Sequence, residues 1–275
     1  MKVRNLRSKW EGAMFKSSIV LPLLGVMFLA GISPALDPND PALVGLWLCD
    51  EGKGDVVKDS SGNGNDGKFV GTFGWIDGKF GKAVLCKGGG SIDVEISDSL
   101  NSITDALTIA GWFRVDAPSD TGPRRNGAYL LEDQSNVEPV PDGWSFRIWT
   151  DRGITPGFYG TTELKQGEWY HIAGVYDGET VKLYIDGVPE PKALTSGGAD
   201  WDAKWSGKIQ TPANKLQLKF GPEPYTGGMD EIILFSRALS DDEIKQLTKG
   251  WASVLGLEPQ ANMLPITWAR MKMIR

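Results

Sequence analysis

Residues 225–249 constrain the fold most, because they predict a strand that leads directly into a capped helix. The apolar run from Ile232 to Phe235 is typical of a buried strand. Ser240 is followed three residues later by Glu243, which is the spacing of a capping box, and two aspartates occupy the first turn, where the helix dipole favours them. The segment therefore predicts one short helix near the end of the chain.

Most of the preceding chain alternates between apolar and polar residues, as half-buried strands do. Residues 107–115 are the clearest single strand. Residues 168–187 predict a hairpin, because two alternating arms flank the turn pair Asp177-Gly178. We count about a dozen short strands, which fits an all-β fold with two antiparallel sheets packed face to face as a β-sandwich.

The loop at residues 59–67 is rich in glycine, asparagine and aspartate. Glycine permits left-handed backbone angles, so such a loop folds tightly and turns carbonyl and side-chain oxygens inward. Calcium prefers six to eight oxygen ligands of these kinds. The residues also fit a turn with capping acids and no ion, and their spacing is not that of an EF-hand.

Four motifs together resemble the LamG-like jelly-roll domains of the concanavalin A-like lectin/glucanase superfamily. They are the 59–67 loop, the glycine turn 78–81 with the apolar strand after it, the 168–187 hairpin and residues 225–249. The resemblance covers residues 43–249 and implies a jelly-roll sandwich. It also implies a structural calcium between the first-strand loop and the last strand. The implied ligands are Asp59, Asn63, Asn65 and Asp230, with Asp50 as a further oxygen donor.

The N-terminal segment of the chain predicts export. Residues 1–35 are interpreted as a signal peptide, because a basic front precedes an apolar run and the small residues Ser33-Pro34-Ala35. The alternative is an uncleaved membrane anchor, and we expect no membrane contact other than through this segment. The apolar run is, however, shorter than the ~20 residues that a spanning helix needs. Residues 36–42 are interpreted as a linker and 250–275 as an extension. We expect a secreted, extracellular or periplasmic protein.

The net charge indicates which classes of partner the protein can bind, and the two cysteines raise the question of a disulfide. The formal net charge is −6 and becomes −10 without the first 35 residues, so nothing suggests nucleic acid. An acidic surface suits a divalent cation better than an anionic ligand. Cys49 and Cys86 are either a disulfide of an exported protein or two small buried apolar residues.

No catalytic pattern stands out. Retaining glycosidases need two carboxylates ~5 Å apart, and no predicted strand carries them on one face. Asp230 and Glu231 are adjacent and would face opposite sides. His171, the single histidine, lies in an apolar strand, which fits a core residue better than a base or a zinc ligand.

Tryptophan offers a route to sugar binding, since its ring stacks on flat apolar surfaces. Trp201 and Trp205 fall in a predicted loop and Trp149 ends a predicted strand, whereas Trp47, Trp112 and Trp169 fit the sheets. We predict a non-catalytic module that binds a carbohydrate or an extracellular protein. The alternatives are a glycan-active hydrolase and a purely structural module.

Overall fold

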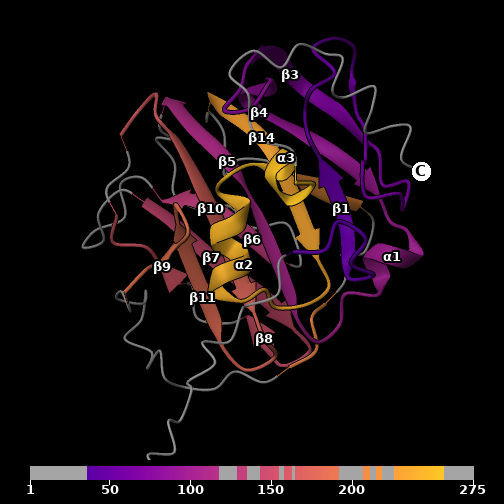
Figure 1. The fold of residues 1–275 in the computed structure, drawn as a ribbon, viewed down its shortest axis with the longest axis vertical. Helices are drawn as coiled ribbons and strands as arrows, with labels where there is room; N and C mark the ends of the chain where they lie inside the picture. The colour runs from indigo at the N-terminus through magenta and orange to yellow at the C-terminus, as the bar shows by residue number, and fades with distance from the viewer. Residues whose placement is uncertain are drawn as a thin grey trace, which may run out of the picture. The chain divides into compact units, whose positions relative to one another are not determined.

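The computed structural model describes residues 36–117, 129–134, 143–154, 158–162, 165–191, 207–210, 215–218 and 226–256. These ranges form a ten-stranded sheet and a four-stranded sheet, with every pair of neighbouring strands antiparallel (Figure 1). The strands are β1 (Leu43–Trp47), β2 (Val56–Val57), β3 (Gly67–Asp77), β4 (Lys82–Glu95), β5 (Leu107–Ala117), β6 (Tyr129–Gln134), β7 (Gly143–Thr150), β8 (Gly153–Ile154), β9 (Phe158–Tyr159), β10 (Trp169–Tyr176), β11 (Val181–Ile185), β12 (Val188–Pro189), β13 (Lys215–Leu218) and β14 (Thr226–Phe235). The all-β prediction is confirmed.

Strand β14 organises the large sheet, whose order is β12-β11-β10-β5-β14-β4-β3-β2. One edge of β14 pairs with β5. The other edge pairs first with β4 at Thr226–Met229 and then with β1 at Ile232–Phe235. The register against β5 shifts between Asp230 and Ile233, where Glu231 has a φ of 46°. The predicted last strand is therefore the central one.

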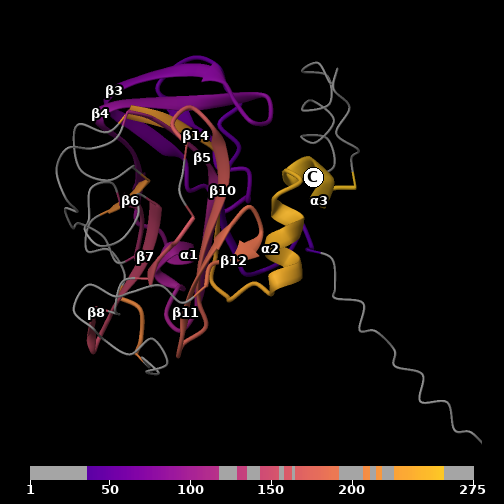
Figure 2. The same ribbon diagram turned by 90° about the vertical axis from the view of Figure 1, so that its left-hand side faces the viewer.

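Two cores lie on opposite faces of the large sheet. The inner core packs that sheet against β7, and a Cβ added at Gly174 would meet the ring of Phe146. The outer core packs β1, β5, β10 and β14 under the two C-terminal helices, at residues 241–247 and 251–254 (Figure 2). Burial of these two apolar faces is the main stabilising term of such a sandwich.

Three helices occur among the described residues: α1 (Asp98–Asn101), α2 (Asp241–Leu247) and α3 (Trp251–Val254). Helix α2 is the predicted one, and both hydrogen bonds of its Ser240–Glu243 capping box are present. The prediction of a single helix was wrong, because α1 and α3 are one turn each and carry little periodic signal. Trp251 of α3 is buried, so the first residues of the predicted extension pack on the domain.

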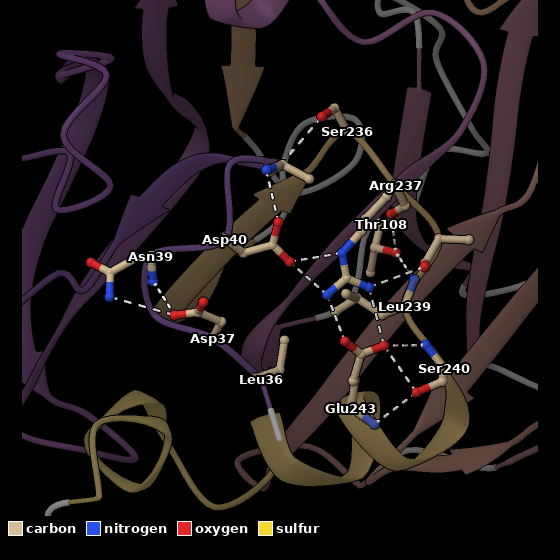
Figure 3. Close-up of polar contacts among 12 residues, drawn as sticks. Leu36, Asp37, Asn39, Asp40, Thr108, Ser236, Arg237, Leu239, Ser240 and Glu243 are labelled. Carbon is tan, nitrogen blue, oxygen red and sulfur yellow. Dashed lines mark hydrogen bonds and ion pairs between the residues drawn. The ribbon is translucent and has the colours of Figure 1, made fainter. Parts of the chain in front are cut away.

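Residues 36–42, the predicted linker, are fixed to α2 rather than free of it. Figure 3 shows Arg237 between two carboxylates: its Nη2 lies 2.7 Å from Asp40 and 2.5 Å from Glu243. The backbone N–H of Leu36 donates to Gln246, and the Leu36 side chain is buried. The segment therefore belongs to the folded domain.

The two cysteines are free thiols buried in the inner core, and the disulfide alternative stays open to the labelling test described below. Cys49 follows β1, and Cys86 lies within β4 opposite Gly227 of β14. The Cys49 thiol instead donates to the carbonyl of Trp47, 3.5 Å away. Burial raises the pKa of both thiols, that of Cys86 to about 12.

Residues 1–35, the predicted signal peptide, lie outside the described residues. Among those that are described, no helix is both long and apolar enough to cross a membrane.

Candidate functional site

Asp59 is the centre of a hydrogen-bonded loop against β1. Its Oδ1 accepts the backbone N–H groups of Leu46 at 3.0 Å and Ser61 at 2.8 Å. Its Oδ2 accepts the hydroxyl of Ser61 at 2.8 Å and the backbone N–H of Asn65 at 2.9 Å. Both carboxylate oxygens are therefore already used in closing the loop.

The two asparagines of the loop donate to the main chain. Nδ2 of Asn63 donates to the carbonyls of Leu43 at 2.8 Å and Val44 at 3.0 Å, and Nδ2 of Asn65 donates to Val44 at 2.8 Å. Oδ1 of Asn65 accepts the hydroxyl of Ser97, the N-cap of α1. The loop thus fastens β1 and α1 together by side-chain bonds.

Asp230 belongs to a different neighbourhood. The bridge between Trp47 and Asp59 lies on the edge of β1 opposite the one that pairs with β14, so β1 separates Asp59 from β14. Oδ2 of Asp230 accepts the backbone N–H of Phe80 at 2.9 Å, which holds the 78–81 turn over the sheet. A Cβ at Gly78 would lie 2.6 Å from this oxygen, so the close approach requires glycine.

Asp230 Oδ1 has no hydrogen-bond partner and is fully buried. Burial, and then the neighbouring charge of Glu231, raise the pKa of Asp230 well above its usual range. Asp50 lies close enough to add to this effect, and burial raises its own pKa to about 6. The backbone N–H of Lys82 donates to Asp50 at 2.7 Å.

These contacts do not place the four predicted calcium ligands around one ion. Three of them close a loop with their own hydrogen bonds, and Asp230 lies across β1. Within the described part of the chain, no group of three or more histidine, cysteine, aspartate or glutamate side chains could hold a metal ion. Asp230 Oδ1 is the one predicted ligand atom with a free buried acceptor, and the calcium ion stays a prediction.

The acids of β14 are not arranged for glycoside hydrolysis. Asp230 and Glu231 are both buried, and Oε2 of Glu231 accepts the backbone N–H of Trp251 in α3 at 2.8 Å. Glu231 therefore lies beneath the helical side of the large sheet, and the carboxylate of Asp230 lies against the 78–81 turn. The inward positions of β5, β10 and β14 are glycine, apolar or tyrosine, with no carboxylate.

His171 is a core residue, as expected. It is buried on β10 beside Trp112 of β5, with ring centroids 5.5 Å apart. Burial lowers the pKa of His171 to about 3, so the imidazole is neutral at physiological pH. Its Nδ1 has no partner, and no serine or carboxylate side chain among the described hydrogen bonds is joined to its ring.

Of the three tryptophans predicted to bind a ligand, only Trp149 is described. It is half-buried near the end of β7 and alternates with the buried residues Phe146 and Ile148, so its side chain faces away from the core. Trp201 and Trp205 lie outside the described residues. The predicted set of three ligand-binding tryptophans therefore stays a prediction.

Sequence reasoning missed an aromatic cluster on β3, which we name the β3 aromatic strip: Phe69, Phe73 and Trp75. Phe69 and Phe73 stack with centroids 3.9 Å apart, and Trp75 meets Phe69 edge-on at 5.6 Å. Phe73 and Trp75 are only partly buried. The three rings are spaced by four and two residues, which indicates one face of a strand, and this spacing was the available signal. Residues 75–82, however, were interpreted as a turn.

Comparison with known proteins points to one family. A family model described as the concanavalin A-like lectin/glucanases superfamily matches residues 88–245. No curated protein sequence matches the chain significantly.

Among solved structures, domain 4 of an extracellular arabinanase from Geobacillus stearothermophilus, in complex with arabinotriose, is similar at a TM-score of 0.51 and 19% identity. The match covers 75% of this chain and 98% of that domain. The binding domain of Paraclostridial mosquitocidal protein 1 is similar at a TM-score of 0.54 and 18% identity, and the match covers 78% of this chain and 53% of the other. Botulinum neurotoxin type C, described as interacting with two ganglioside molecules, is similar at a TM-score of 0.53 and 13% identity. That match covers 78% of this chain and 52% of the neurotoxin chain. The chain thus spans about half of these two toxin chains, and the likeness concerns the fold.

Proposed function

The chain belongs to the concanavalin A-like lectin/glucanase superfamily, and from this we propose that it is a non-catalytic module that binds glycans. The observation that carries the proposal is that the inward positions of β5, β10 and β14 carry no carboxylate. The two carboxylates of β14 are buried, that of Glu231 against α3 and that of Asp230 against the 78–81 turn, whereas glycoside hydrolysis needs two carboxylates on either side of an accessible sugar. Partly exposed aromatic rings remain as contacts for a sugar.

Two similar structures support a glycan as the partner. The arabinanase domain is described in complex with arabinotriose, and the neurotoxin in terms of gangliosides. A related neurotoxin binding domain is described in complex with the protein synaptotagmin II, so a protein partner is the second outcome of the test. Export of the chain, through the segment 1–35, belongs to the same proposal.

The proposal is tested by screening the purified protein against immobilised neutral, acidic and sialylated glycans, followed by calorimetry of any hit. The same glycans are incubated with the protein and analysed for new reducing ends. We expect saturable binding without cleavage. Reducing ends that accumulate with enzyme concentration would show a hydrolase instead, and no binding to any glycan would leave a protein partner or a structural role.

A further inference from the structure

We propose that the β3 aromatic strip is the glycan-binding surface and that its ligand is an uncharged oligosaccharide. The inference rests on the proposed function and names the place and the ligand class. It begins from Phe73 and Trp75, two large rings that remain partly exposed although they lie beside the inner core. Exposed aromatic faces next to polar groups are typical of small-molecule sites.

The rings of the strip are held in place before any ligand arrives. Phe73 lies nearly parallel to Phe69, at an interplanar angle of 15°, and Phe69 is buried. The indole N–H of Trp75 donates to the carbonyl of Gly54 at 3.1 Å, which fixes the direction of that ring. Because the rings are fixed, little conformational entropy is lost when a sugar stacks on them.

Polar groups border the rings along the strand edge. Strand β2 pairs with β3 only at Gly67 and Lys68, and beyond Phe69 no described strand pairs with that edge. Backbone N–H and C=O groups of residues 70–76 therefore alternate beside the rings. A pyranose has an apolar C–H face and a rim of hydroxyl groups, and this surface offers partners for both.

Absence of charge selects the ligand class. Residues 69–76 contain no ionisable side chain, in a chain with a formal net charge of −6. Asp77, at the end of the strip, lies 2.6 Å from the ammonium of Lys82 and is neutralised by it. No unpaired cation lies within residues 69–77, and the neighbouring loop 50–55, whose Gly54 holds Trp75, carries one lysine against three acids. The charges around the strip therefore favour a neutral sugar over an acidic one.

The same edge is a poor template for an added peptide strand. Gly71 has a φ of 85°, and the register between β3 and β4 shifts between Val70 and Thr72. Such an irregularity bends an edge and interrupts a regular ladder of hydrogen bonds. A bent edge does not hinder a sugar, which makes local contacts.

The test uses the purified protein with cellohexaose, xylohexaose and arabinotriose as neutral probes and oligogalacturonate as the acidic probe. Trp75→Leu keeps an apolar side chain but removes the aromatic face, and Trp75→Phe restores an aromatic face. Trp169→Leu is the matched control, since Trp169 is a half-buried tryptophan of β10 whose ring lies 5.2 Å from the guanidinium of Arg114. Trp149→Leu tests the tryptophan that the sequence predicted to bind a ligand. Thermal unfolding of each variant checks that it is folded.

We expect a neutral probe to bind, Trp75→Leu to weaken its Kd about tenfold, Trp75→Phe to stay within about threefold, and Trp169→Leu to change nothing. If Trp75→Leu does not fold, ligand-induced shifts of the Trp75 indole N–H resonance in the wild-type protein decide the question. Loss of binding in Trp149→Leu with unchanged binding in Trp75→Leu, or preference for oligogalacturonate, would overturn the assignment while the glycan-binding function stands. Failure of the wild-type protein to bind any glycan would remove both.

Discussion

The backbone N–H of Asn65 donates to Oδ2 of Asp59 at 2.9 Å, and this bond closes the loop that was predicted to hold calcium. Together with the N–H groups of Leu46 and Ser61, it makes Asp59 the acceptor for three main-chain donors. A carboxylate bound in this way stabilises the loop without a metal, because hydrogen bonds to a charged group contribute about 1.5–3 kcal/mol each.

We therefore expect Asp59→Asn to lower the free energy of unfolding by about 2 kcal/mol, since the new amide N–H₂ would face N–H donors. The loss should be the same in calcium and in chelator. Asp55→Asn is the control, because Asp55 is an exposed acid near the same loop. Urea unfolding of the three proteins measures the effect.

Calcium itself is tested on the wild-type protein. A ligand that binds only the native state at a hundredfold excess over its Kd adds about 3 kcal/mol, which shifts Tm by several degrees in a domain of this size. Because the 59–65 loop closes by its own hydrogen bonds, we expect any calcium-dependent rise in Tm to be kept in Asp59→Asn. A rise that is kept in Asp59→Asn but lost in Asp230→Asn would locate the ion at the free Oδ1 of Asp230, whereas a rise lost in Asp59→Asn would locate it in the loop.

The thiols give a third prediction. Cys49 and Cys86 are buried and unbonded, and their raised pKa values leave little thiolate at neutral pH. We expect alkylating reagents to label neither cysteine in the native protein and both after unfolding without reductant. Mass spectrometry of peptides from the unfolded protein measures this, and a mass lower by two protons with no label would establish a disulfide.

Local signals predicted the local structure well. Alternation around Asp177-Gly178 gave the β10–β11 hairpin, and the spacing of Ser240 and Glu243 gave the start of α2. Long-range placement was beyond the same reasoning. The partner of Asp230 is Phe80, 150 residues away, and the direction of the amides of Asn63 and Asn65 depends on where β1 passes. Trp75 was missed because β3 continues through glycines that resemble a turn.

His171 predicts a loss of stability in acid. Burial lowers its pKa to about 3 in the folded protein, below the ordinary value near 6.5. The contribution of the neutral imidazole to stability is therefore complete above pH 6.5 and is lost as pH falls toward 3, by up to about 5 kcal/mol. His171→Phe should flatten this acid limb in urea unfolding at pH 4–7. An unchanged limb would show that other groups cause it.

Glu231 predicts the opposite dependence. Burial raises its pKa to about 8 from an ordinary value near 4.5, so its neutral form is favoured in the folded protein. The contribution of this carboxyl group to stability is complete below pH 4.5 and is lost as pH rises through 8, by up to about 5 kcal/mol. Asp50, with its pKa raised to about 6, contributes in the same direction.

The variant Glu231→Gln separates the contribution of Glu231 to the pH dependence of stability from that of Asp50. The amide oxygen of glutamine can still accept the backbone N–H of Trp251, so the start of α3 keeps its contact while the titrating group is removed. We expect the variant to lose less stability than the wild-type protein between pH 5 and 8, with Asp50→Asn reducing mainly the lower part of that range. Parallel pH profiles for Glu231→Gln and wild type would mean that Glu231 is ionised in the folded protein and that another group compensates its burial.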